Sequence, residues 1–113
     1  MFKIIYKTKS EHKLKSFIVS YKNVFLRTFV DTGLFYEDII RQNYINNSEK
    51  FYNEIIDNID QLLIWKNIFW YKILDNNNLQ TITKVWNFRL FIEFTENFKE
   101  KIRYVEDIDI YSK

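Results

Sequence analysis

Residues 79–105 read LQTITKVWNFRLFIEFTENFKEKIRYV, and this stretch decides the fold class. Apolar and polar side chains alternate over residues 79–85, 88–95 and 101–105, which is typical of β-strands with one buried face. Residues 96–99 (ENFK) are expected to form the turn of the last hairpin. Strands that follow one another at such short spacing pair antiparallel, so we expect a meander in the last third of the chain.

Two more strands are expected nearer the N-terminus. Residues 68–74 (IFWYKIL) are almost wholly apolar, which predicts a mostly buried strand that includes Trp70, and residues 75–78 (DNNN) predict a tight turn after it. Residues 2–7 (FKIIYK) alternate with a period of two and predict an N-terminal strand. The expected sheet therefore has an N-terminal strand and a four-strand antiparallel meander.

The residues after the first strand have the spacing of a helix. Ser10 offers an N-cap, and apolar side chains from Leu14 to Phe25 recur every three or four residues. Gly33 is the only glycine of the chain and can adopt the left-handed conformation that commonly ends a helix. We therefore expect the first helix to stop near residues 31–33.

One or two further helices are expected before the meander. Residues 35–45 predict a second helix, Asn46 and Asn47 a break, and Ser48 the cap of a third helix with an apolar stripe. A strand, two to three helices and a meander make an α+β fold with the helices packed on one face of the sheet. At 113 residues, a single domain spanning residues 1–113 is expected.

The alternation within residues 88–94 assigns side chains to the two faces of the sheet. One face is apolar, and the other is polar in its middle because it carries Arg89 and Glu93. If the last strand keeps Ile102 on the apolar side, Arg103 lies on the polar face opposite Glu93. The polar face is the expected functional surface.

Composition excludes most catalytic chemistry. The chain has no Cys, one Gly and one His, so thiol nucleophiles, glycine-rich phosphate loops and histidine-based triads or metal sites are absent. Asp107 and Asp109 alternate along a strand and are a weak metal motif, so neither metal nor cofactor is expected. The longest apolar run, residues 62–74, contains two lysines and is too short to span a bilayer, which takes about 20 residues. We expect a cytoplasmic protein without membrane contact.

Basic side chains concentrate near the N-terminus. The first 28 residues hold seven Lys or Arg against Glu11 alone. Lys13, Lys15 and Lys22 of this segment could meet the phosphates of a nucleic acid or an acidic target. The alternative is a solvated helix face without a binding role.

Residues 87–94 (NFRLFIEF) resemble the central strand of the RelE/ParE superfamily of toxins from type II toxin–antitoxin systems. The run from Lys84 to Tyr111, KVWNFRLFIEFTENFKEKIRYVEDIDIY, looks like the small ParE-like subgroup. The expected order of strand, helices and meander is also similar to that family. The resemblance therefore covers essentially the whole chain, although its central motif is short.

The resemblance implies site residues and partners. Arg89 matches the strand arginine that holds the scissile phosphate in RelE-type enzymes, Lys84 falls near their general-base lysines, and Tyr111 matches the tyrosine that positions the substrate. Apart from the resemblance, Trp86 could stack on a base and Arg103 is expected on the same face as Arg89, so both are candidate contacts to the target. The implied partners are a cognate antitoxin and either DNA gyrase or the ribosome with its mRNA. If it is an enzyme, the protein would be a metal-free mRNA endoribonuclease.

Two other kinds of function stay open. A small non-enzymatic interaction module from a phage or mobile element would bind a host protein through its helices or a sheet edge. A single-strand nucleic-acid binder would use Trp86, Phe91 and the lysines.

Overall fold

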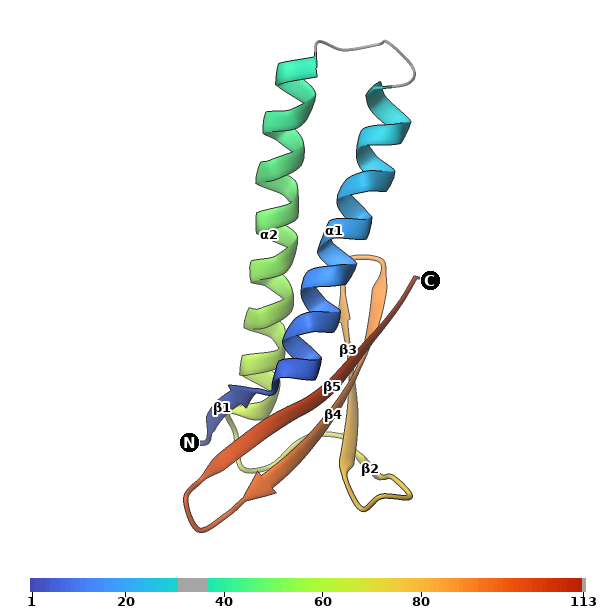
Figure 1. Ribbon diagram of the computed structural model, residues 1–113. Coiled ribbons are helices and arrows are strands. Elements are labelled where there is room, and N and C mark those ends of the chain that lie inside the picture. Colours follow the sequence, from blue (N-terminus) through green and yellow to red (C-terminus); the bar gives the residue numbers. More distant parts are fainter. Residues whose placement is uncertain (31–36, 113) are drawn as a thin grey trace.

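The structure is a computed structural model that describes the backbone of residues 1–30 and 37–112 and the side chains of residues 1–21 and 47–112. It has an α+β fold with two helices and five strands, which confirms the expected class (Figure 1). In chain order the elements are β1 (Lys3–Tyr6), α1 (Thr8–Val30), α2 (Glu37–Leu63), β2 (Lys72–Ile73), β3 (Leu79–Val85), β4 (Phe88–Asn97) and β5 (Ile102–Ser112).

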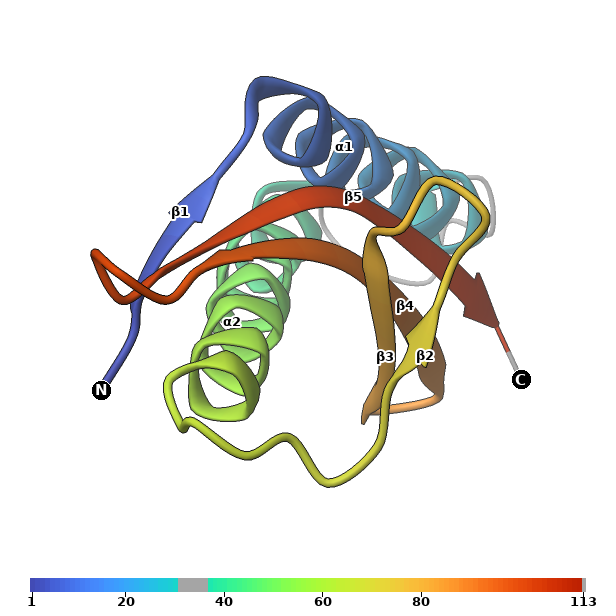
Figure 2. The ribbon, with the colours of Figure 1, turned by 90° about the horizontal axis from the view of Figure 1, so that it is seen from below.

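The five strands form one mixed sheet in the order β1-β5-β4-β3-β2. The meander from β2 to β5 is antiparallel as predicted, while β1 pairs with β5 in parallel. The short β1 covers only the first part of β5, and α1 lies beside the strand further along (Figure 2). Where the pairing with β1 ends, the Ser10 hydroxyl of α1 donates a hydrogen bond to the Val105 carbonyl. The helix thus protects part of an otherwise open strand edge.

Both helices contribute to one core on one face of the sheet. Four buried residues of α2 recur every four positions and form its apolar stripe: Phe51, Ile55, Ile59 and Leu63. They pack with Leu14 of α1 and with the alternating inward side chains of the strands, among them Leu90, Ile92, Phe94, Val105 and Ile108. The opposite face of β3, β4 and β5 is left for the polar side chains.

The two helices differ from the sequence prediction at their caps. The helix α2 continues through Asn46 and Asn47, so the expected break and third helix are wrong. Asparagine in a helix costs less than about 1 kcal/mol relative to alanine, and the buried stripe that follows offsets this cost. Ser48 lies buried within α2 rather than at a cap. Ser10 is not the N-cap of α1 either, because the helix begins at Thr8.

The end of α1 agrees with the prediction as far as it is described. The helix ends at Val30, close to the expected stop near residues 31–33. Gly33 itself, and residues 35–36 at the expected start of the second helix, lie outside the described residues.

The expected buried strand over residues 68–74 is mostly wrong. Only Lys72 and Ile73 pair with β3, and Phe69 and Trp70 are exposed. An apolar run of this kind predicts burial, but β2 is the outer strand of the sheet and no described element covers it. The tight turn that follows is confirmed, since Asn77 has a φ of 68° and the Leu74 amide donates to the Asn78 carbonyl.

A β-bulge changes the faces of β5. Glu93 pairs with Asp107 and Phe94 with Val105, so Glu106 is an extra residue of β5. The predicted register is wrong along the whole strand, since Glu93 pairs with Asp107 and not with Arg103. The predicted faces are wrong only before the bulge, where Arg103 pairs with Glu96 and points to the core side. Odd-numbered residues of β5 face the core before the bulge and the polar face after it. Asp107, Asp109 and Tyr111 therefore share the polar face with their partners on β4.

Arg103 is buried at the end of α2 and is 1% exposed. Its guanidinium donates to the carbonyls of Leu63, Trp65 and Lys66, where the helix has no basic residue of its own in the last turn. Its Nε donates to Glu96 at 3.0 Å, and the ring of Phe2 lies 4.0 Å below the guanidinium carbon. These bonds satisfy carbonyls that a helix terminus otherwise leaves unpaired.

Candidate functional site

The three residues that the resemblance identifies lie in one row across the polar face. In the sheet register, Lys84 of β3 pairs with Arg89 of β4, and Arg89 pairs with Tyr111 of β5. Side chains at paired positions of neighbouring strands lie on the same face, with Cβ atoms about 5 Å apart. The fold therefore brings together residues that are separated by up to 27 positions in the chain.

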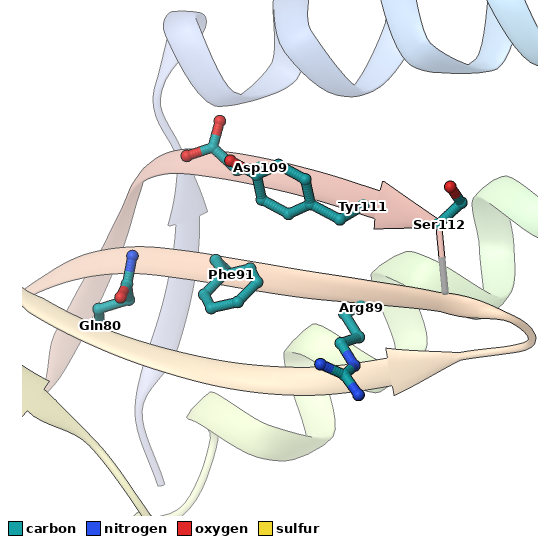
Figure 3. A pocket seen from close by; sticks show the side chains of 6 residues that line it. All are labelled: Gln80, Arg89, Phe91, Asp109, Tyr111 and Ser112. Carbon is teal, nitrogen blue, oxygen red and sulfur yellow. The ribbon is translucent and has the colours of Figure 1, made fainter.

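A hollow with a volume of about 550 Å³ lies over Arg89 and Tyr111 of this row, whereas Lys84 is not among the residues that line it. Figure 3 shows the six residues that line it: Gln80, Arg89, Phe91, Asp109, Tyr111 and Ser112. The rings of Phe91 and Tyr111 meet edge to face with centroids 5.4 Å apart, which gives the hollow an aromatic side next to the Arg89 guanidinium. A cation beside an aromatic surface suits a ligand that is both anionic and planar.

Lysines of α1 neutralise the acidic residues of the polar face. The Lys13 ammonium lies 2.9 Å from a carboxylate oxygen of Asp107 and 2.9 Å from one of Asp109. Lys9 adds a second cation 3.3 Å from Asp107. Asp109 lines the hollow, so this pairing reduces the repulsion that its carboxylate would exert on an anionic ligand.

The same contacts change two pKa values. Partial burial opposes ionisation of Asp107, but hydrogen bonds and charge from Lys13 and Lys9 outweigh it and hold the pKa of Asp107 below its usual value. Hydrogen bonds to Asp107 and Asp109 raise the pKa of Lys13. Lys13 was predicted to contact a target, and in the structure its ammonium is instead occupied by these two carboxylates.

This cluster leads to a prediction about acid stability. Because the pKa of Asp107 is lowered on folding, its stabilising effect is complete above the unfolded pKa of about 4 and is lost as the pH falls through the folded pKa. The variant Asp107→Asn should lose about 1 kcal/mol or less of unfolding free energy at neutral pH, since Lys13 is well exposed. In urea unfolding the difference from wild type should shrink towards about pH 3. A constant difference at both pH values would contradict the prediction.

The other residues expected to contact a target are spread over the molecule. Lys15 is exposed on α1, and the side chain of Lys22 lies outside the described residues. Trp86 is half exposed in the turn between β3 and β4, where its ring lies 4.5 Å from that of Phe51. The placement of Arg103 on the polar face is wrong, because the bulge turns it inward, where it bonds the end of α2 and is not available to a partner.

Several residues of the hollow were not expected from the sequence. The strand register brings Gln80 of β3 and Ser112 of β5 to the hollow. The last strand was expected over residues 101–105, but β5 extends to Ser112 and therefore includes Tyr111. From the sequence, Asp109 is a weak metal ligand and an acidic neighbour that would repel RNA, but not a lining residue of a site. The signal that would have found it is the alternation of Asp107, Asp109 and Tyr111, which share a face.

The described part of the chain offers cations and aromatic rings rather than a metal site. Among residues 1–21 and 47–112, no group of three carboxylate or histidine side chains is placed to hold a metal ion. In the same part of the chain, no helix is both long and apolar enough to cross a bilayer. The chemistry of the hollow is that of binding an anion through Arg89, with Tyr111 and Phe91 at its side. Lys84 lies outside the hollow, at the position of β3 that pairs with Arg89.

No model of a protein family, no curated protein and no solved structure matches the chain.

Proposed function

We propose that the protein is a growth-arresting toxin of the RelE/ParE kind, held inactive by a cognate antitoxin, and that the polar sheet face is its working surface. The observation that carries the proposal is the row of Lys84, Arg89 and Tyr111 at paired positions of three neighbouring strands. The resemblance rests on sequence segments alone, and the register that places Lys84, Arg89 and Tyr111 at paired positions supports it independently. The order of β1, two helices and an antiparallel meander supports the same proposal.

Cleavage of mRNA on the ribosome is the mode of action that the row supports best. Cleavage without a metal requires removal of the proton from a 2′-hydroxyl, attack of that oxygen on phosphorus, and departure of the 5′-oxygen from a phosphorane whose charge is stabilised. In this proposal Arg89 binds the phosphate oxygens, the neutral amine of Lys84 takes up the 2′-hydroxyl proton, and Tyr111 with Phe91 positions a base. The departing 5′-oxygen takes a proton from water, so the products are a 2′,3′-cyclic phosphate and a 5′-hydroxyl. The pairing of Asp107 and Asp109 with lysines favours this mode over the gyrase mode, since it lowers the repulsion of RNA.

Regulated expression in a bacterial host tests the proposal. Growth should stop on induction, with broken messages and unchanged plasmid supercoiling in the same cultures. Arrest with intact messages and relaxed or damaged DNA would instead identify gyrase as the target. Continued growth of cells that contain folded protein would contradict the toxin proposal. Co-expression of a short neighbouring gene that restores growth would identify the antitoxin.

A second candidate function is a non-enzymatic interaction module. The observation that favours it is the exposed aromatic segment between α2 and β2, where Trp65, Phe69, Trp70 and Tyr71 are all at least 46% exposed. Large apolar side chains that are exposed together usually mark an interaction surface, whereas single exposed apolar side chains are common on any protein. The module would show no growth arrest and would still bind a protein partner.

A further inference from the structure

The end of the molecule opposite the hollow exposes several large apolar side chains. Arg89 is the second residue of β4 and Phe98 follows its last residue, so the two ends of this ten-residue strand are about 30 Å apart. At the far end Phe98 is 62% exposed and Tyr71 is 52% exposed. Trp65, directly after α2, is 57% exposed. Apolar surface of this kind is costly in water unless a partner covers it for part of the time.

Two adjoining hollows lie among these side chains. One has a volume of about 270 Å³ and is walled by Tyr71, Leu79 and Phe98, next to the start of β2. The other has a volume of about 320 Å³ and lies between Phe98 and Lys101 of the β4–β5 turn and the N-terminal Phe2. Lys66 and Phe98 line both hollows, so together they form one surface, which we call the Lys66 surface.

The charge of the Lys66 surface is positive. Lys66 and Lys101 are exposed, and neither has an ion pair among the side chains that the structure describes. The only carboxylate that lines the two hollows is that of Glu96, which accepts a hydrogen bond from Arg103 at 3.0 Å and is therefore already neutralised. A partner with carboxylates would complement the two lysines.

The edge of the sheet lies beside the hollow that Tyr71 and Leu79 line. β2 is the outer strand in the sheet order, and Ile73 of this strand pairs with Leu79 on the inner side only. An extended chain can add to such an edge through main-chain hydrogen bonds, while neighbouring pockets take up its alternate side chains. Hollows beside a short free edge suit an extended segment better than a helix.

We propose that the Lys66 surface binds an extended polypeptide segment in which acidic residues alternate with apolar ones. Its apolar side chains enter the two hollows, its carboxylates pair with Lys66 and Lys101, and the end of the segment that fills the hollow at Tyr71 and Leu79 lies along β2. A second copy of the protein is a poor occupant, because it would bring the same lysines face to face. The inference does not depend on the proposed toxin function, since it concerns the opposite end of β4.

Selection from a displayed library of random linear peptides tests this assignment on the full-length protein. Peptides enriched on the wild type should be rich in Asp and Glu alternating with Leu, Ile or Val. In fluorescence anisotropy, Lys66→Glu should weaken an enriched peptide by roughly tenfold or more, and added salt should weaken its binding to wild type. Tyr71→Ser should weaken it as well, because it removes one wall of the first hollow.

The matched control is Lys50→Glu, which makes the same charge change at an exposed position of α2 that lines neither hollow and should leave peptide binding unchanged. Thermal unfolding by circular dichroism should show that all three variants remain folded. The proposal is overturned if no peptide is enriched, if the enriched peptides are basic, or if Lys66→Glu binds as tightly as wild type. Self-association or binding of anionic vesicles that Tyr71→Ser abolishes would also overturn it. Growth is not read in this experiment, so a failed toxin proposal leaves its result intact.

Discussion

Replacement of Arg103 by methionine is expected to lower the free energy of unfolding by about 3–5 kcal/mol. The substitution leaves the carboxylate of Glu96, whose side chain is only 14% exposed, without its cation and removes the donors for three backbone carbonyls at the end of α2. Unpaired buried groups of this kind lose their bonds to water without replacement, so each adds to the cost. For a domain of this size such a loss is a large part of the total stability of about 5–15 kcal/mol.

Urea unfolding and the midpoint of thermal unfolding measure this effect. The midpoint should fall by more than about 10 °C. Lys101→Met, which removes an exposed cation two residues away, should change the free energy of unfolding by less than about 0.5 kcal/mol. The double variant Arg103→Met with Glu96→Met should recover part of the loss, since no buried carboxylate is then left unpaired. An Arg103→Met protein as stable as the Lys101→Met control would contradict this account.

Arg103 also shows why the sequence alone could not assign the faces of the last strand. A period of two predicts faces correctly only while the pairing is regular, and one extra residue reverses every assignment on one side of it. Glu106 is that residue, and nothing in its type distinguishes it from its acidic neighbours Asp107 and Asp109. The assignment of Arg89 and Glu93 was correct because β4 has no extra residue between them.

The order of elements was predictable because it depends on local patterns. The alternation of apolar and polar side chains predicted β1 and β3–β5, and the Asp and Asn residues at 75–78 predicted the turn. The apolar stripe of α2 was predicted from apolar residues that recur every four positions. The exposure of residues 69–71 was not predictable, since a buried strand and an uncovered aromatic segment have the same composition. Only the position of β2 at the edge of the sheet separates the two.

The candidate site was predictable only through the resemblance. Composition excluded other chemistry and left Lys, Arg and Tyr, but it did not bring Lys84, Arg89 and Tyr111 together. Their proximity depends on two strand registers, and that of β4 and β5 includes the bulge. The pairing of Lys13 with Asp107 and Asp109 is a contact between elements more than 90 residues apart in the chain, which no local pattern contains.

Replacement of Arg89 by alanine is expected to abolish growth arrest while leaving the fold intact. Loss of one fixed donor to a transition-state oxyanion typically costs about 100- to 1000-fold in rate, and message cleavage in induced cells should fall accordingly. Arg89 is exposed, and among the described residues its side chain has no hydrogen bond or ion pair, so the free energy of unfolding should change by less than about 0.5 kcal/mol. Lys50→Ala on α2 is the control and should arrest growth like wild type. Arrest by Arg89→Ala equal to that of wild type would exclude the polar face as the working surface.

The variant Arg89→Lys separates the charge of Arg89 from its geometry. A guanidinium offers parallel N–H donors to two oxygens of one phosphate, whereas an ammonium is a compact point charge on a flexible stem. If Arg89 holds the scissile phosphate between Lys84 and Tyr111, the lysine variant should recover less than about a tenth of the wild-type cleavage rate, although it keeps the charge. Full recovery of the cleavage rate would mean that Arg89 supplies only a positive charge to the RNA phosphate and that the two parallel donors of its guanidinium are not needed.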